Sequence, residues 1–201
     1  MSQNILDSVF WDNKYLNNED AWDIGKPTPI FVNYESKLIK KSKILIPGCG
    51  RGYDAMYLSS KGHNVDALDF SSLALNYLKQ NSIKRKLTLN VINEDFFSIS
   101  KKYNCYYDYI FEYTFFCAIQ TKYRQEYVEK CHSILKKNGK IISIFLPMTA
   151  NNNNASPPYQ VTINEVKTLF KEKFNIKIKE NLVNSIGPRK NNEFFAELKK
   201  I

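Results

Sequence analysis

The chain contains no long hydrophobic run. Its longest apolar stretch, from Ile141 to Met148, includes a serine and a proline, and it is far shorter than the roughly 20 residues that a membrane helix requires. The first twenty residues carry several acids and do not resemble a secretory or transit signal. We therefore expect a cytoplasmic protein with no membrane partner. Its 201 residues, 43% of them hydrophobic, fit a single globular domain with a substantial core.

Cysteine and histidine are scarce. The four cysteines, at positions 49, 105, 117 and 131, form no Cys-x-x-Cys pair, and only His63 and His132 could join them at a metal. A helix would point the adjacent residues Cys131 and His132 to different faces. The pattern argues against a zinc site and predicts reduced, mostly buried thiols, with no metal cofactor.

Positive charge exceeds negative charge, and the formal net charge is +9. Such a chain can bind an acidic partner, nucleic acid included. However, the lysines are scattered, and the densest basic stretches, Lys40–Lys43 and Lys84–Lys86, lie just before predicted strands. We interpret them as solvated connectors rather than as a nucleic-acid surface. The sequence does not determine the oligomeric state, and a monomer is the simplest expectation.

The most informative feature is a strand–turn–helix–strand unit. The apolar run Ile44–Pro47 leads into a Gly-x-Gly-x-Gly turn at residues 48–52, and a second apolar run, Val65–Leu68, ends at Asp69. Glycines at such a turn let the backbone approach a nucleotide, and the acid can hold ribose hydroxyls. Tyr53 stands where a dinucleotide fingerprint has its third glycine. The pattern therefore favours a nucleoside without a pyrophosphate, of which S-adenosylmethionine is the obvious one.

Alternating strand and helix patterns predict an α/β fold. Strands are expected at about 43–47, 64–69, 87–92, 106–112, 139–146, 174–183 and 193–198, and helices at about 52–61, 71–81, 121–136 and 162–172. We expect a Rossmann-like, seven-stranded, mostly parallel sheet with helices on both faces and an antiparallel C-terminal hairpin. Asn138-Gly139 is expected to close the third of these helices. Residues 1–40 are expected to form a helical lid on a core of residues 41–201.

Candidate ligand contacts lie at the carboxyl ends of the predicted strands, where open α/β sheets bind their ligands. Gly48 and Gly50 would bring the backbone to the ligand, and Asp69 would accept hydrogen bonds from both ribose hydroxyls. Asp95 would accept from the adenine amino group, and Phe96 would cover the ring. Asp69 could instead cap the helix that follows it.

Aromatic residues near the N-terminus form a second signal. Trp11 and Tyr15 are four residues apart and therefore share a helical face, and Trp22 follows before a glycine–proline break. An aromatic wall attracts a sulfonium cation by ~0.5–2 kcal/mol per contact. The same residues could simply attach the first helix to the core.

Several of these segments together resemble a known family. They are Phe10–Asp12, Ala21–Pro29, Ile46–Gly50, Tyr113–Ile119, Leu135–Gly139 and Pro157–Val161. They resemble the thiopurine S-methyltransferase superfamily of class I S-adenosylmethionine-dependent methyltransferases, and its plant-type halide/thiol methyltransferases in particular. The resemblance implies S-adenosylmethionine as cofactor, S-adenosylhomocysteine as product, and cofactor contacts at Trp11, Trp22, Gly48, Asp69, Asp95, Phe96 and Tyr113. Tyr15 replaces the tryptophan usual in the plant-type proteins, and the poorer match to the mammalian drug-methylating branch disfavours a bulky purine substrate.

The segment Ser156-Pro157-Pro158-Tyr159 has two interpretations. Amino-methyltransferases acting on nucleic acids and proteins carry a similar tetrapeptide directly after the fourth strand, whereas here it follows the fifth predicted strand. We therefore predict a rigid loop that directs Tyr159 into the substrate pocket to orient the nucleophile. Tyr15 and Phe116 would line the same pocket.

No histidine is placed to act as a general base. A thiol with a pKa near ~8.5 is partly ionised at neutral pH, so a thiol, sulfide or halide acceptor needs little help. The sequence thus predicts an S-adenosylmethionine-dependent methyltransferase that acts on a small thiol or sulfide, with halides as further candidates. Two alternatives stay open: a nucleic-acid or protein N-methyltransferase, and a non-catalytic nucleoside-binding module.

Overall fold

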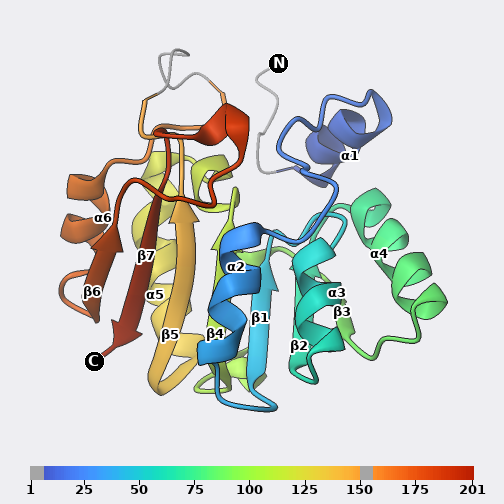
Figure 1. Ribbon diagram of the computed structural model, residues 1–201, viewed down its shortest axis with the longest axis horizontal. Helices are drawn as coiled ribbons and strands as arrows, with labels where there is room; N and C mark the ends of the chain where they lie inside the picture. Colours follow the sequence, from blue (N-terminus) through green and yellow to red (C-terminus); the bar gives the residue numbers. More distant parts are fainter. Residues whose placement is uncertain (1–6, 150–155) are drawn as a thin grey trace. The chain divides into compact units, whose positions relative to one another are not determined.

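The computed structural model describes residues 7–149 and 156–201 (Figure 1). The chain forms two compact units, Met1–Ile99 and Ser100–Ile201. The predicted single domain and its division into a lid and a core stay predictions, and residues 1–6 of the predicted lid lie outside the described residues.

Three parallel strands form the framework of the first unit. They are β1 (Lys43–Pro47), β2 (Asn64–Asp69) and β3 (Asn90–Asn93), in the order β3-β2-β1. The first two strands have the predicted bounds, and the third begins three residues later than expected. Most side chains of β1 and β2 are buried, as the near-continuous apolar runs of parallel strands require.

The described part of the first unit contains four α-helices, and the first and the last of them begin at a side-chain cap. They are α1 (Ser8–Leu16), α2 (Pro29–Tyr34), α3 (Tyr53–Ser60) and α4 (Ser72–Lys84), with short 3₁₀ segments at Glu35–Lys37 and Phe96–Ser98. The Ser71 hydroxyl caps α4 by accepting a hydrogen bond from the Ala74 amide at 3.2 Å. The helix α1 packs against α4, and α3 packs against β2 (Figure 1).

Four strands form the framework of the second unit. They are β4 (Tyr107–Tyr113), β5 (Leu135–Phe145), β6 (Phe174–Lys179) and β7 (Phe194–Lys200), in the order β4-β5-β7-β6. The first two run parallel, and β7 runs antiparallel to both β5 and β6, as predicted. Helices α5 (Arg124–Ile134) and α6 (Ile163–Phe170) pack on this unit (Figure 1).

The prediction that Asn138-Gly139 closes a helix was wrong. The helix α5 ends at Ile134, and β5 begins directly at Leu135, so both residues lie inside the strand. The register between β4 and β5 shifts in this region, with Asn138 at φ +63°. A residue in the left-handed backbone conformation followed by a glycine suits an irregularity in a strand as well as it suits a helix end. Long-range pairing of Leu135 with Tyr107 therefore decided the outcome.

No helix in the described part of the chain has the length and apolar character needed to cross a membrane.

Candidate functional site

The turn after β1 is a tight glycine loop. Gly50 and Gly52 both have positive φ, at +52° and +72°, and the Gly52 amide donates to the Cys49 carbonyl at 2.9 Å. A Cβ atom on Gly52 would lie 2.4 Å from a methyl carbon of Leu78. A Cβ on Gly50 would lie 2.9 Å from the hydroxyl of Tyr15. Gly52 therefore permits the packing of α4, whereas Gly50 permits the close approach of the Tyr15 hydroxyl.

Asp69 ends β2 and holds this loop. One carboxylate oxygen accepts from the Gly50 amide at 2.8 Å, and the other accepts from the Ser71 amide at 2.9 Å. Burial raises the pKa of Asp69, and these hydrogen bonds oppose the rise. Each carboxylate oxygen can accept more than one hydrogen bond, so the residue can take ribose hydroxyls in addition. Asp69 thus holds the start of α4 as well as the glycine loop, and its role toward a ribose stays a prediction.

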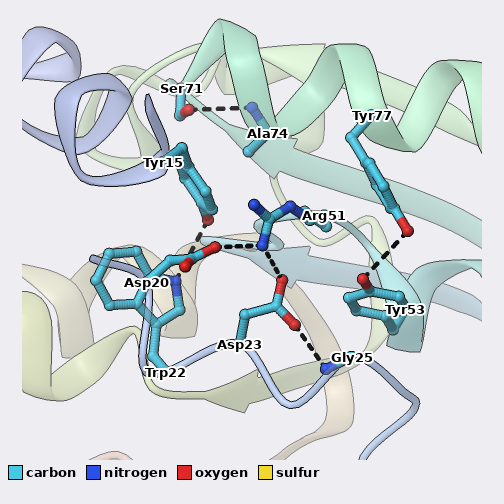
Figure 2. Close-up of polar contacts among 10 residues, drawn as sticks. All are labelled: Tyr15, Asp20, Trp22, Asp23, Gly25, Arg51, Tyr53, Ser71, Ala74 and Tyr77. Carbon is cyan, nitrogen blue, oxygen red and sulfur yellow. Dashed lines mark hydrogen bonds and ion pairs between the residues drawn. The ribbon is translucent and has the colours of Figure 1, made fainter. Parts of the chain in front are cut away.

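Three aromatic side chains gather beside the loop. Trp11 and Tyr15 project from α1, and the ring of Trp22 meets them edge to face, with centroids 5.3 and 5.6 Å away. The Trp22 indole N–H donates to the Tyr15 hydroxyl at 3.4 Å (Figure 2). Burial raises the pKa of Tyr15, which keeps its hydroxyl neutral. The predicted aromatic wall therefore exists as a cluster, with the Tyr15 hydroxyl lying against Gly50.

Arg51, within the glycine loop, ties the N-terminal segment to the loop. One guanidinium nitrogen contacts Asp20 and lies 2.5 Å from a carboxylate oxygen of Asp23 (Figure 2). The guanidinium also lies 5.1 Å from the centre of the Tyr15 ring and 5.6 Å from that of Tyr77. We call Arg51, Asp20 and Asp23 the arginine latch. Sequence reasoning missed it, because the partners are about thirty residues apart and no local pattern links them.

A second acid anchors α1. The carboxylate of Asp12 accepts from the Ser71 hydroxyl at 2.6 Å and from the Ser72 hydroxyl at 3.3 Å. Because both serines stand at the start of α4, Asp12 holds α1 against the start of α4. These hydrogen bonds give the acid of the segment Phe10–Asp12 a structural role beside its two aromatic residues.

Asp95 and Phe96 occupy different environments. Asp95 is exposed after β3, and its carboxylate accepts from the Phe97 amide at 3.1 Å. Phe96 is only 1% exposed and packs edge to face with Phe97. Asp95 thus caps a 3₁₀ turn and leaves acceptor capacity free, while Phe96 belongs to the core. Their roles toward an adenine ring stay predictions.

In the second unit, Tyr113 is the last residue of β4. Its hydroxyl donates to a carboxylate oxygen of Glu193 at 2.8 Å, and the Arg189 guanidinium lies 4.7 Å from the centre of its ring. Burial raises the pKa of Tyr113, the Arg189 charge lowers it, and Glu193 raises it further. Sequence reasoning singled out Tyr113 and missed both partners.

Two of the three predicted acceptor residues, Phe116 and Tyr159, lie in the second unit. The Tyr159 amide donates to the Cys117 carbonyl at 2.7 Å, so the Pro-Pro-Tyr loop is fixed to the turn after β4. Tyr159 is 4% exposed, and Phe116 is 1% exposed against Phe145 and other core rings. Their predicted roles in a substrate pocket stay predictions.

Arg124 joins the Pro-Pro-Tyr loop to the turn after β4, and sequence reasoning did not predict this contact. It is fully buried at the start of α5 and donates to the Gln160 carbonyl at 2.9 Å and to Glu165 at 2.6 Å. Its guanidinium also stacks 4.7 Å from the centre of the Phe116 ring. A buried arginine in a basic chain gives no signal in the sequence by itself.

Among residues 7–149 and 156–201, no three or more histidine, cysteine, aspartate or glutamate side chains group in a way that could hold a metal ion.

The family model described as thiopurine S-methyltransferase matches residues 6–197. The chain belongs to the thiopurine S-methyltransferase family. It is 32% identical to "Probable thiol methyltransferase 2" of Arabidopsis thaliana, an alignment that covers 100% of this chain and 88% of that protein. It is 30% identical to "Thiocyanate methyltransferase 1" of Brassica oleracea, over 95% of this chain and 84% of that protein.

The thiopurine S-methyltransferase family assignment agrees with the fold. A Burkholderia thailandensis 1,6-didemethyltoxoflavin N1-methyltransferase, solved with bound 1,6-didemethyltoxoflavin and S-adenosylhomocysteine, superposes with a TM-score of 0.79 at 14% identity. The superposition covers 98% of this chain and 87% of that chain. The predicted Rossmann-like methyltransferase fold with antiparallel C-terminal strands is therefore confirmed, as is the predicted family.

Proposed function

We propose that this protein transfers a methyl group from S-adenosylmethionine to a small thiol or sulfide, with halides as further acceptors. The observation that carries the proposal is the arrangement around Gly50. There the Asp69 carboxylate, which can accept from ribose hydroxyls, a glycine loop and an aromatic cluster meet within one unit. Membership of a methyltransferase family supports the same chemistry.

The residues present fit the methyl donor. Asp69 offers acceptors for two ribose hydroxyls, the backbone at Gly50 can be approached closely, and the rings of Trp11, Tyr15 and Trp22 suit a cation. When bound, S-adenosylmethionine supplies a methyl carbon activated by a positively charged sulfur. By family resemblance, we also propose Gly48, Asp95, Phe96 and Tyr113 as contacts.

A sulfur acceptor is favoured for two reasons. An anionic thiolate and a sulfonium cation lose charge together on reaction, so a water-poor site accelerates the transfer. In addition, the relatives named above are described as thiol and thiocyanate methyltransferases. The chain's own residues would bind and orient the acceptor and exclude water. We propose Tyr159 as the residue that orients it, and Tyr15 and Phe116 as further residues of the substrate pocket.

The test is an assay of methyl-donor consumption with hydrosulfide, methanethiol, longer thiols, iodide and a thiopurine. We expect turnover with the small sulfur acceptors and little with the thiopurine. Asp69→Ala should abolish donor binding in calorimetry, whereas Glu126→Gln, at an exposed position on α5, should bind as the unmodified protein does. Equal donor affinity of the Asp69→Ala variant would contradict the assigned site.

The same assay separates the alternatives. Turnover with an RNA, DNA or protein amine but not with thiols would identify an N-methyltransferase, and an electrophoretic shift with nucleic acid at physiological salt would accompany it. Donor binding without consumption by any acceptor would identify a non-catalytic module.

A further inference from the structure

Two buried glutamates lie near the end of β4, and they differ in how many of their carboxylate oxygens accept hydrogen bonds. Glu112 is 1% exposed and fully engaged. One oxygen accepts from the amides of Phe115 and Phe116 at 3.0 and 2.8 Å, and the other accepts from the Ser143 hydroxyl. Glu112 therefore serves to hold the turn that follows the strand.

Glu193 is buried to the same degree but is only half engaged. It is 3% exposed, and one oxygen accepts from the Tyr113 hydroxyl at 2.8 Å. Within the described residues, its other oxygen, Oε1, is buried without a hydrogen-bond partner. Buried carboxylate oxygens are normally satisfied, so such an exception calls for an explanation.

The position of the pair points to the ligand edge. Tyr113 is the last residue of β4, and Glu193 directly precedes β7. The first residue of β7, Phe194, pairs with Phe145 at the end of β5. Both members of the pair thus lie at the carboxyl ends of the parallel strands, where open α/β sheets bind their ligands. Tyr113 is half-buried whereas Glu193 is buried, so Tyr113 is the more accessible member of the pair.

We propose that Tyr113 and Glu193 form a proton relay that accepts the proton of a neutral thiol substrate. The proposal rests on the proposed function. The thiol S–H bond breaks and its proton passes to the Tyr113 hydroxyl oxygen, while the tyrosine's own proton moves to the Glu193 carboxylate. The sulfur electron pair forms the new bond to the methyl carbon, and the pair of the broken C–S⁺ bond stays on the donor's sulfur. Glu193 then releases its proton to solvent. Tyr113 touches the acceptor, and Glu193 acts through it.

The relay has a test that a purely structural role would not pass. It matters for an alkanethiol, which is mostly protonated at pH 7, but not for an aromatic thiol with an electron-withdrawing group, which is already ionised. Glu193→Gln retains an oxygen for the Tyr113 hydroxyl but cannot take a proton. We expect kcat/KM for the alkanethiol at pH 7 to fall by about 10- to 10²-fold, because a thiol with a pKa near ~8.5 is only a few per cent thiolate at that pH. The value for the ionised thiol should stay within about threefold of the unmodified protein.

Raising the pH through the alkanethiol's own pKa should restore most of the lost activity, because solvent then supplies the thiolate. Tyr113→Phe should show the same split, and Glu180→Gln, at an exposed position in the same unit, should show none. Equal losses of kcat/KM on both thiols would overturn the relay. A ratio of the two kcat/KM values that stays unchanged in both relay variants would also overturn it. Should neither thiol be methylated by the unmodified protein although it binds the donor, the proposed function itself would fail, and the two failures are thereby distinguished.

Discussion

Replacing Arg51 with methionine should release the N-terminal aromatic segment without unfolding the first unit. The Arg51, Asp20 and Asp23 side chains are only 23%, 15% and 12% exposed, so their ion pairs are better shielded than exposed pairs worth ~0.2–1 kcal/mol. Charge-assisted hydrogen bonds of this kind contribute about 1.5–3 kcal/mol. Methionine also leaves two carboxylates facing one another without a cation. We therefore expect the free energy of local opening to fall by about 2–3 kcal/mol.

Hydrogen exchange measures this opening directly. Protection of the α1 amides should fall by roughly 30- to 150-fold, since 1.36 kcal/mol corresponds to a factor of ten. Protection in β1 and β2 should not change. The chain has two tryptophans, Trp11 and Trp22, and both belong to the cluster. Tryptophan emission therefore reports on this segment, and it should shift to longer wavelength as the rings become hydrated.

Lys61→Met is the matched control for Arg51→Met. It removes one positive charge from the same unit, at an exposed residue whose ammonium lies 5.3 Å from the centre of the Tyr57 ring. This control should leave both the α1 protection and the tryptophan emission unaltered. Unchanged protection of α1 in Arg51→Met would refute the reasoning, and so would an equal loss throughout β1 and β2.

Three further outcomes are expected. Gly52→Ala should lower the free energy of unfolding in urea by about 2–5 kcal/mol, the sum of left-handed strain and overpacking against Leu78, and a loss below about 1 kcal/mol would contradict this. Gly50→Ala should weaken donor affinity in calorimetry by about tenfold, a 1.4 kcal/mol effect, and adding Tyr15→Phe should recover part of it by removing the 2.9 Å contact. Burial raises the pKa of Glu112 from 4.5 to about 7. The folded protein therefore binds a proton at Glu112 more tightly than the unfolded chain does, and the stability that this proton contributes is lost as the pH rises from 4.5 through 7. Glu112→Gln resembles the protonated side chain. The free energy of unfolding of this variant in urea should therefore fall by about 3 kcal/mol less than that of the unmodified protein between about pH 4.5 and pH 8. An equal pH dependence of the two proteins would contradict this expectation.

Local chemistry determined much of the framework. The apolar runs of β1 and β2 fixed both strands at their predicted bounds, and Ser71 began α4 as expected. The glycine turn and Asp69 could be placed because strand, turn and acid lie within about thirty residues. Each of these features depends on backbone preferences or on neighbours close in sequence.

Tertiary packing decided the rest. Tyr113 meets Glu193 across eighty positions of the chain, and Arg51 meets Asp23 across twenty-eight. The strand β5 began four residues early because Leu135 pairs with Tyr107. Side chains far apart in sequence leave no periodic pattern, because their contact depends on how whole elements pack. The sequence alone therefore established the fold, the family and the glycine loop with its acid, whereas only the folded chain could show which charged groups lie beside them.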